Sequence, residues 1–293
     1  MFYGSNVAIV TPLKNGSVDE QSLVDLIEFH IENGTHGIVP CGTTGESPTL
    51  NHEEHKQVVK LTVDTVNGRI PVIAGTGSNC TEEAISLTQY AKEVGADGSL
   101  QVVPYYNKPT QEGLYRHFKE IASTVDIPII LYNIPGRSVV SLTVDTITRL
   151  ASECKNIVGI KEASGSLNYA SKILQSCGLD FILLSGEDSL NLPLLSIGAK
   201  GFITVTANIL PSDVAELYNS FSSGDFEKAL QIHYKLQPLN ELLFIETNPI
   251  PIKSALSMMG KINPGFRLPL CEMSPQNYEK LKMGMQSIGL ISK

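Results

Sequence analysis

The sequence lacks the patterns that mark secreted, disulfide-rich and membrane-spanning proteins. Its five cysteines are scattered and form no CxxC pair, which argues against a disulfide framework or a zinc site and favours a reducing cytoplasm. No stretch is long and apolar enough to span a bilayer. The first residues, MFYGSNVAIVTPL, show no basic segment followed by a long apolar one, so we expect no secretory signal.

Positive charge is also scarce. The chain has 22 Lys and Arg against 30 Asp and Glu, a net charge of −8, and no dense basic run. This balance argues against nucleic acid and anionic membranes as partners. With 293 residues, of which 42% are hydrophobic, the chain is long enough to bury the core of one large α/β domain.

Eight short apolar runs recur along the first two thirds of the chain. They span residues 6–10, 37–40, 71–75, 99–103, 128–132, 157–161, 181–186 and 201–205. Runs of this kind are typical of parallel strands that are covered on both faces. Segments between them, such as 19–33 and 81–94, have apolar residues at helical spacing. The pattern predicts a (β/α)8 TIM barrel. A doubly wound sheet is the rival fold, but GTGSNC at 75–80 lacks the GxGxxG spacing.

The strand pattern stops after residue 210. Apolar positions three and four residues apart predict helices over 211–222, 225–245, 250–260 and 275–288. No Gly/Ser-rich or Pro-rich linker separates these helices from the barrel. We therefore predict a catalytic barrel over 1–224 and a C-terminal helical region over 225–293 packed on it.

Polar residues concentrate where the predicted strands end. CGTTGES (41–47), PYYNKP (104–109), YNIPGR (132–137) and SGED (185–188) each follow or finish an apolar run, and the run IVGIK ends in Lys161. Active sites of barrel enzymes lie at the carboxyl ends of the strands. These segments are therefore expected to converge on one site.

Lys161 is the most informative of these residues, because an ammonium is costly to bury at the end of an apolar strand. Burial favours the neutral amine, which attacks ketones. The resulting iminium acidifies the adjacent carbon, as in class I aldolases. Tyr132 can reach the carbinolamine oxygen, Thr43 or Thr44 can pass protons or hold a carboxylate, and Arg137 can bind a second carboxylate. A lone lysine after a strand is more commonly a solvated surface residue, but its neighbours favour the catalytic interpretation.

Metal and pyridoxal phosphate chemistry are less well supported. HEEH at 52–55 spaces His52 and His55 by three residues, whereas the zinc helix HExxH spaces them by four. No histidine falls at the ends of the last four predicted strands, and no phosphate-cradling loop is evident. We therefore expect neither a metal nor another cofactor.

The motifs VAIVTP, CGTTGES, PYYNKP, LYNIPGR, VGIKEASG, GFITVTAN and NPIPIK together resemble the dihydrodipicolinate synthase family. This family is part of the pyruvate-dependent class I aldolases, which include N-acetylneuraminate lyase. The resemblance covers essentially the whole chain, and the arginine of YNIPGR favours the synthases over the sialic acid lyases. It implies a cytoplasmic lyase that condenses pyruvate with L-aspartate 4-semialdehyde to 4-hydroxy-tetrahydrodipicolinate, in the diaminopimelate route of lysine biosynthesis.

The resemblance also implies roles for individual residues. Lys161 forms the imine with pyruvate, and Thr43, Tyr132 and Tyr106 form a proton relay. Tyr106 is expected to come from a neighbouring subunit of a homotetramer, a dimer of dimers. The substrate-binding positions implied by the resemblance are Thr44 for the pyruvate carboxylate, Arg137 for the semialdehyde carboxylate, and Gly186 and Ile203 for backbone near the substrate.

Some members of the family are inhibited by L-lysine at a subunit interface. The matching positions here are Ser47, Pro48, His52, His55, Asn79, Glu83 and Tyr105. An acid and two imidazoles near a dimer cleft can hold an ε-ammonium, so the resemblance predicts inhibition. The alternative is a helix that carries His52 and His55 as ordinary surface residues.

Two other functions stay open at this point. The chain could be a different pyruvate aldolase, which cleaves a sialic acid or a 2-keto-3-deoxy sugar acid. It could also be a catalytically silent barrel that binds a small molecule as a regulator, although it keeps every reactive position named above. Departures from the family pattern are small: Ser138 and Ser141 stand where Thr and an Asp or Asn are more common.

Overall fold

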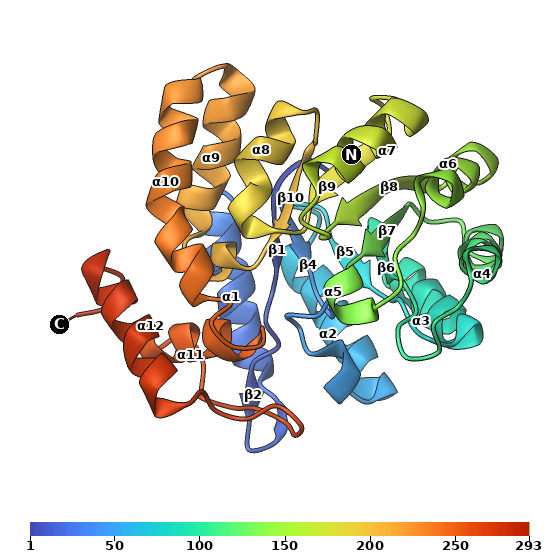
Figure 1. The fold of residues 1–293 in the computed structure, drawn as a ribbon. Coiled ribbons are helices and arrows are strands. Elements are labelled where there is room, and N and C mark those ends of the chain that lie inside the picture. The colour runs from blue at the N-terminus through green and yellow to red at the C-terminus, as the bar shows by residue number, and fades with distance from the viewer. Residues whose placement is uncertain (293) are drawn as a thin grey trace.

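The computed structural model describes residues 1–292, and its centre is an eight-stranded parallel sheet that curls into a barrel (Figure 1). The strands lie side by side in the order β4-β1-β10-β9-β8-β7-β6-β5, and a bridge between Ile38 and Val72 joins the two outer strands. The predicted (β/α)8 barrel is therefore confirmed. The strands are β1 (Gly4–Ala8), β4 (Gly37–Val39), β5 (Ile73–Gly75), β6 (Gly98–Val102), β7 (Ile129–Asn133), β8 (Ile157–Glu162), β9 (Ile182–Ser185) and β10 (Gly201–Thr204).

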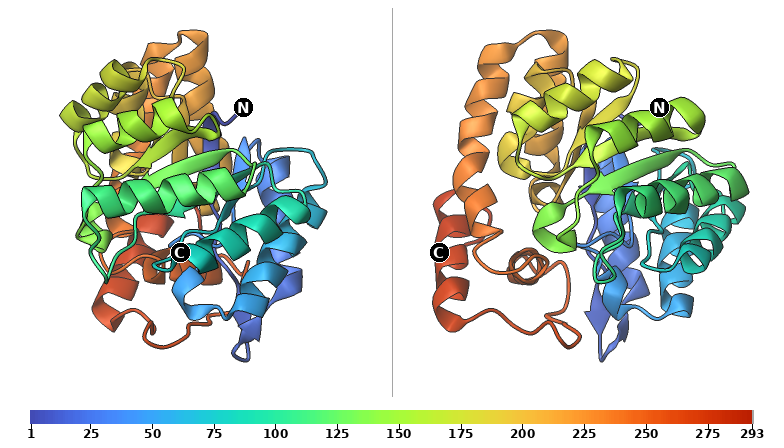
Figure 2. Two further views of the ribbon diagram at one scale, coloured as in Figure 1. Left: turned by 90° about the vertical axis from the view of Figure 1, so that its right-hand side faces the viewer. Right: turned by 45° about the vertical axis from the view of Figure 1, so that its right-hand side comes forward.

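Helices follow the strands and surround the barrel, as two further views show (Figure 2). They are α1 (Glu20–Glu32), α2 (His52–Val66), α3 (Thr81–Glu93), α4 (Gln111–Thr124), α6 (Val144–Glu153), α7 (Leu167–Cys177), α8 (Asn191–Ser196) and α9 (Pro211–Ser223). Several begin at a side-chain cap: Asn51 and Glu54 form a capping box at α2, and the Ser166 hydroxyl accepts from the Tyr169 N–H at α7. Most boundaries lie within two residues of the prediction.

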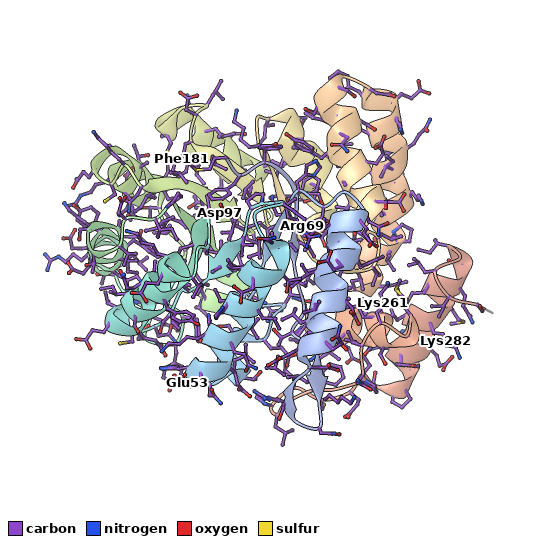
Figure 3. The ribbon with its side chains drawn as sticks, turned by 180° about the vertical axis from the view of Figure 1, so that it is seen from behind. Glu53, Arg69, Asp97, Phe181, Lys261 and Lys282 are labelled. Atoms are coloured by element: carbon purple, nitrogen blue, oxygen red, sulfur yellow. The ribbon has the colours of Figure 1, made fainter. Side chains whose placement is uncertain are left out.

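The rear of the molecule is covered by helix side chains (Figure 3). There Arg69, just after α2, donates to both carboxylate oxygens of Glu28 on α1 at 2.6 and 2.7 Å, which ties the two helices together. A short hairpin of β2 (Leu13–Lys14) and β3 (Ser17–Val18), which the sequence did not predict, projects beside them. None of the helices within residues 1–292 is long and apolar enough to cross a membrane.

The barrel interior is filled mainly by apolar side chains from the strands. Ile73, Leu100, Ile130 and Leu184 are all at most 3% exposed and form one cluster. Phe2 closes the amino end, where a β-carbon on Gly98 would lie 2.6 Å from its ring. Phe2 therefore fills the amino end, and active sites of barrel enzymes lie at the opposite, carboxyl end.

The C-terminal region consists of α10 (Phe226–Leu242), α11 (Ile250–Met258) and α12 (Pro275–Ser287). α10 packs against α9, and the chain after α11 returns to the hairpin of β2 (Figure 1). There Arg267 donates to the Gly16 carbonyl at 2.6 Å and to the Glu54 carboxylate at 2.7 Å. These contacts hold the C-terminal region over the carboxyl end of the barrel.

Candidate active site

A cavity of about 360 Å³ opens at the carboxyl end of the barrel. Thr43 from the loop after β4, Tyr132 from the end of β7 and Arg137 from α5 (Pro135–Ser138) line it together. Residues 247–249 and 269–270 of the C-terminal region form another part of its wall. The structure thus brings these three predicted residues into one space with Ser47 and Tyr105 of the predicted lysine site, and it adds a wall from far along the chain.

Lys161 lies beside Tyr132 within the barrel. The two are direct partners in the parallel register of β8 and β7, which turns their side chains to the same face. Lys161 is 6% exposed, and its Nζ is 4.3 Å from the centre of the Tyr132 ring. No carboxylate within residues 1–292 forms an ion pair with it. The result is a buried lysine beside a tyrosine ring and without a salt bridge in the described residues, although its charge opposes the rise in pKa that burial causes at the Glu187 carboxyl.

Gly186 provides the space that the Lys161 side chain occupies. A β-carbon at this position would lie 2.9 Å from Lys161 Cε and 2.7 Å from Ala163 Cβ. Ile203 on β10 is 1% exposed and packs in the barrel interior with Tyr132. Both predicted backbone positions therefore lie in the same part of the barrel as the lysine.

The loop after β4 is held by close backbone contacts. Cys41 adopts a left-handed conformation, with φ of 54°, and its carbonyl approaches Gly75 so closely that a β-carbon there would lie 2.3 Å from it. The Thr11 hydroxyl donates to the Gly45 carbonyl at 2.7 Å. Burial raises the pKa of the Cys41 thiol, which keeps this cysteine protonated as part of the core.

The two adjacent threonines of this loop, Thr43 and Thr44, have different environments. Thr43 is half-buried and lines the cavity. Thr44 is only 2% exposed, and its hydroxyl oxygen accepts a hydrogen bond from Asn248 Nδ2 at 3.0 Å. Thr44 is therefore tied to the C-terminal region rather than to the other predicted site residues.

Arg137 is presented by the short helix α5. Pro135 begins this helix, and at its end the Ser138 hydroxyl oxygen lies 2.9 Å from the Ile134 carbonyl and 2.7 Å from the Val140 carbonyl, either of which can accept its one proton. The guanidinium of Arg137 donates from Nη2 to the Asn248 carbonyl at 3.0 Å, and its remaining N–H groups make no hydrogen bond within residues 1–292. They are available to a carboxylate in the cavity.

Tyr105 and Tyr106 lie in the segment between β6 and α4. Tyr105 lines the cavity, and its backbone N–H donates to Asn79 Oδ1 at 2.7 Å. Tyr106 is 92% exposed and does not line the cavity of its own chain. A single chain therefore does not place Tyr106 in the relay.

The residues predicted to bind lysine lie close together beside this cavity. His52 pairs with Glu83, and Ser47 Oγ lies 3.5 Å from His55 Nδ1. Hydrogen bonds from Ser78 and His52 lower the pKa of the Glu83 carboxyl although burial opposes them, while burial lowers the pKa of His55. The group combines a carboxylate held in its charged form with a neutral imidazole. His55 is buried, so the alternative of two surface histidines is wrong for this residue.

A buried ion pair next to the cavity was not predicted. Glu46 lines the cavity and pairs with Lys253 of α11, and both side chains are 1% exposed. Burial lowers the pKa of Lys253, and the nearby Glu46 carboxylate opposes this shift. A lysine inside the apolar stretch IPIKSAL was the sequence signal, and it is the same kind of signal as Lys161.

Another buried carboxylate supports the catalytic strands from outside the barrel. Asn133 and Glu162 follow Tyr132 and Lys161 and are also register partners, so they point to the opposite face. Asn133 Nδ2 donates to Glu162 Oε2 at 2.9 Å. Burial raises the pKa of Glu162, against hydrogen bonds from Ser164 and Asn133. This pair joins β7 to β8 where the tyrosine and the lysine must stay aligned.

The fold and the site define a class. A (β/α)8 barrel that carries a buried lysine beside a tyrosine, with an arginine in the same cavity, has the components of a lysine-dependent aldolase. Among residues 1–292 no group of three or more His, Cys, Asp or Glu side chains is placed to hold a metal ion.

The chain belongs to the dihydrodipicolinate synthetase family, whose sequence model matches residues 1–288. The 4-hydroxy-tetrahydrodipicolinate synthase of Thermodesulfovibrio yellowstonii is 60% identical over 291 residues, which cover 99% of this chain and 100% of that protein. The crystal structure of dihydrodipicolinate synthase from Aquifex aeolicus is 55% identical, with a TM-score of 0.98 and full coverage of both chains.

Two other solved relatives are complexes. The dihydrodipicolinate synthase of Acinetobacter baumannii, complexed with pyruvate, is 49% identical with a TM-score of 0.97 over 99% of this chain and 100% of that one. The synthase of Cyanidioschyzon merolae with lysine bound is 41% identical, with a TM-score of 0.95 over 99% of each chain.

Proposed function

We propose that this protein condenses pyruvate with L-aspartate 4-semialdehyde to give 4-hydroxy-tetrahydrodipicolinate, a step in the diaminopimelate route of lysine biosynthesis. The observation that carries the proposal is the buried Lys161 amine, which has no carboxylate partner and lies 4.3 Å from the Tyr132 ring. The activity of the 60% identical relative supports the choice of substrates.

The chemistry begins with attack of the Lys161 amine on the keto carbon of pyruvate. Loss of water gives an imine, and its electron demand lets a base remove a proton from the methyl carbon. The enamine carbon then adds to the aldehyde carbon of the second substrate, whose oxygen takes up a proton. The amino group of that substrate attacks the imine carbon, closes the ring and releases Lys161 as the free amine.

The proposal assigns proton transfer to Thr43, Tyr132 and Tyr106 of the partner subunit. Thr43 and Tyr132 share the cavity, which supports their part of the relay. Tyr106 is 92% exposed and does not line the cavity of its own chain, which supports a role in a neighbouring site. We therefore propose a homotetramer, a dimer of dimers. Sedimentation equilibrium tests this assembly, and a monomer with full activity would contradict the shared relay.

The carboxylates of the two substrates are assigned to separate donors. Thr44 and the surrounding loop hold the carboxylate of pyruvate, and Arg137 holds that of the semialdehyde. The free N–H groups of Arg137 beside the cavity support this assignment, because a planar guanidinium binds a carboxylate through two parallel hydrogen bonds. Gly186 and Ile203 complete the pocket around the bound imine.

Reduction with borohydride tests the imine directly. Incubation with pyruvate and borohydride should add the mass of one reduced pyruvate to the wild-type chain, and peptide mapping should place it on Lys161. Lys161→Ala should gain no mass, while Lys172→Ala, which removes an exposed lysine of α7, serves as the control. A wild-type chain that gains no mass would rule out the mechanism.

We further propose that L-lysine inhibits the enzyme at the group formed by Ser47, His52, His55, Asn79, Glu83 and Tyr105. The Glu83 carboxylate supports this, because hydrogen bonds keep it charged and an ε-ammonium needs such a partner. Lysine bound to the C. merolae relative supports it as well. Millimolar L-lysine should slow the wild type and leave Glu83→Gln nearly unaffected; an unchanged wild-type rate would contradict the proposal.

We also propose that the enzyme works in the cytoplasm. All five cysteines are free, which suits a reducing compartment. Fractionation of the source cells, with activity measured in each fraction, tests this location.

A further inference from the structure

Asn248 connects two of the proposed substrate-binding residues. It lies just before α11, is 5% exposed and lines the cavity. Its side-chain Nδ2 donates to the Thr44 hydroxyl oxygen at 3.0 Å, and its backbone carbonyl accepts from Arg137 Nη2 at 3.0 Å. Thr44 follows β4 and Arg137 follows β7, so one residue of the C-terminal region holds groups from two distant parts of the barrel rim.

The direction of the bond to Thr44 determines what this hydroxyl can do. A threonine hydroxyl has one proton to donate and two lone pairs to accept with. Because Asn248 Nδ2 is the donor, the Thr44 oxygen uses a lone pair and keeps its proton for another acceptor. The Asn248 Oδ1 atom is buried without a partner within residues 1–292, so the amide does not consume the proton of the threonine.

We propose that Asn248 is a positioning residue that turns the Thr44 hydroxyl proton toward the carboxylate of pyruvate. The C-terminal region then completes the active site as well as covering it. This inference rests on the proposed function, because it assumes that the ligand of Thr44 is the carboxylate of the imine-forming substrate.

The two contacts of Asn248 predict an asymmetric effect of substitution. The contact to Thr44 uses the side chain, whereas the contact to Arg137 uses a backbone carbonyl that every residue has. Replacing the side chain should therefore weaken the pyruvate end of the site and spare the semialdehyde end. A general loosening of the cavity would affect both ends.

The experiment measures KM for each substrate in Asn248→Ala and Asn248→Asp. For Asn248→Ala we expect the KM for pyruvate to rise roughly threefold to tenfold, the effect of one neutral hydrogen bond, and the KM for the semialdehyde to stay within about twofold. Asn248→Asp should raise the KM for pyruvate further, because its carboxylate takes the Thr44 proton and repels the substrate carboxylate. The matched control is Asn263→Ala, which removes an exposed C-terminal asparagine that contacts Asp19 and should change neither KM.

A double-mutant cycle with Thr44→Val separates positioning from a merely structural role. Asn248→Ala should have little further effect on the KM for pyruvate once the Thr44 hydroxyl is gone. Independent effects in the cycle, or an equal rise of both KM values, would overturn the inference. Thermal unfolding checks that each variant is folded, and the isosteric Asn248→Asp keeps the test available if the alanine variant unfolds.

Borohydride trapping distinguishes a failure of the proposed function from a failure of the proposed role of Asn248. A wild-type chain that traps no pyruvate contradicts the proposed function. A wild-type chain that traps pyruvate, together with an Asn248→Ala variant whose KM for pyruvate is unchanged, contradicts only the role of Asn248.

Discussion

Gly186→Ala tests whether the space around Lys161 is as tight as the structure indicates. The new methyl group would lie 2.7 Å from Ala163 Cβ, 2.9 Å from Lys161 Cε and 3.1 Å from Lys161 Cγ. Carbon atoms in good contact are about 3.5–4.0 Å apart, so three contacts at once are too short by roughly half an ångström or more. Either the backbone of the loop after β9 moves, or the lysine side chain does.

The Lys161 side chain is easier to displace than the backbone, because it can rotate about several single bonds. The Ala163 β-carbon, by contrast, can move only together with its main chain. Overpacking of this kind lowers the free energy of unfolding by about 1–3 kcal/mol. A shift of about 1 Å at a reacting group reduces the rate of a positioned reaction by roughly 100-fold. We therefore expect Gly186→Ala to remain folded, with a modestly lowered Tm, and to lose about two orders of magnitude in the rate of imine formation.

The assay is the rate of borohydride-trapped adduct formation with pyruvate, measured alongside thermal unfolding. Gly136→Ala is the control, because a β-carbon at that position has no heavy atom within 4 Å. Its trapping rate and Tm should match those of the wild type. A Gly186→Ala variant that traps pyruvate at the wild-type rate would refute the steric argument.

Three further outcomes are expected. Lys253→Met should lower the free energy of unfolding in urea by about 3–5 kcal/mol, because it leaves Glu46 buried without its cation, and Glu46→Leu in the same chain should restore much of the loss. Burial lowers the pKa of His117 to about 4, so between pH 6.5 and 4 only the unfolded chain binds this proton and stability falls as the pH falls. Over that range the wild type should lose up to about 3 kcal/mol more than His117→Gln in urea titrations, and equal slopes would contradict this. Arg137→Lys should raise the KM for the semialdehyde at least about tenfold by losing the bidentate contact and leave pyruvate trapping unchanged, whereas unchanged kinetics would exclude Arg137 from that site.

Much of the barrel was predictable because its strands are short, apolar and regularly spaced. The runs at 128–132 and 157–161 correspond to β7 and β8 within one residue. The register that pairs Tyr132 with Lys161 could be expected once both were placed at strand ends. Local pattern is sufficient here because parallel strands covered on both faces must be apolar along their length.

The contacts that the C-terminal region makes with the active site could not be predicted from local sequence patterns. Asn248 and Thr44 are separated by 204 residues, and nothing in either neighbourhood indicates that they share a hydrogen bond. The hairpin of β2 and β3 was missed for a related reason: two-residue strands have no hydrophobic period to detect. Long-range contacts of this kind depend on how complete elements pack.

Lys161 and Lys253 show most clearly what the sequence determines and what only the tertiary structure determines. Lys161 ends the run IVGIK and Lys253 lies within IPIKSAL, so the sequence alone places each lysine in an apolar segment. It does not distinguish a reactive amine from half of an ion pair, because a charge partner can come from any part of the chain. The tertiary structure pairs Glu46 with Lys253, whereas Lys161 lies over the Tyr132 ring and forms no ion pair within residues 1–292. A paired ammonium is stabilised by its carboxylate, whereas an unpaired buried amine is available to react with a carbonyl carbon.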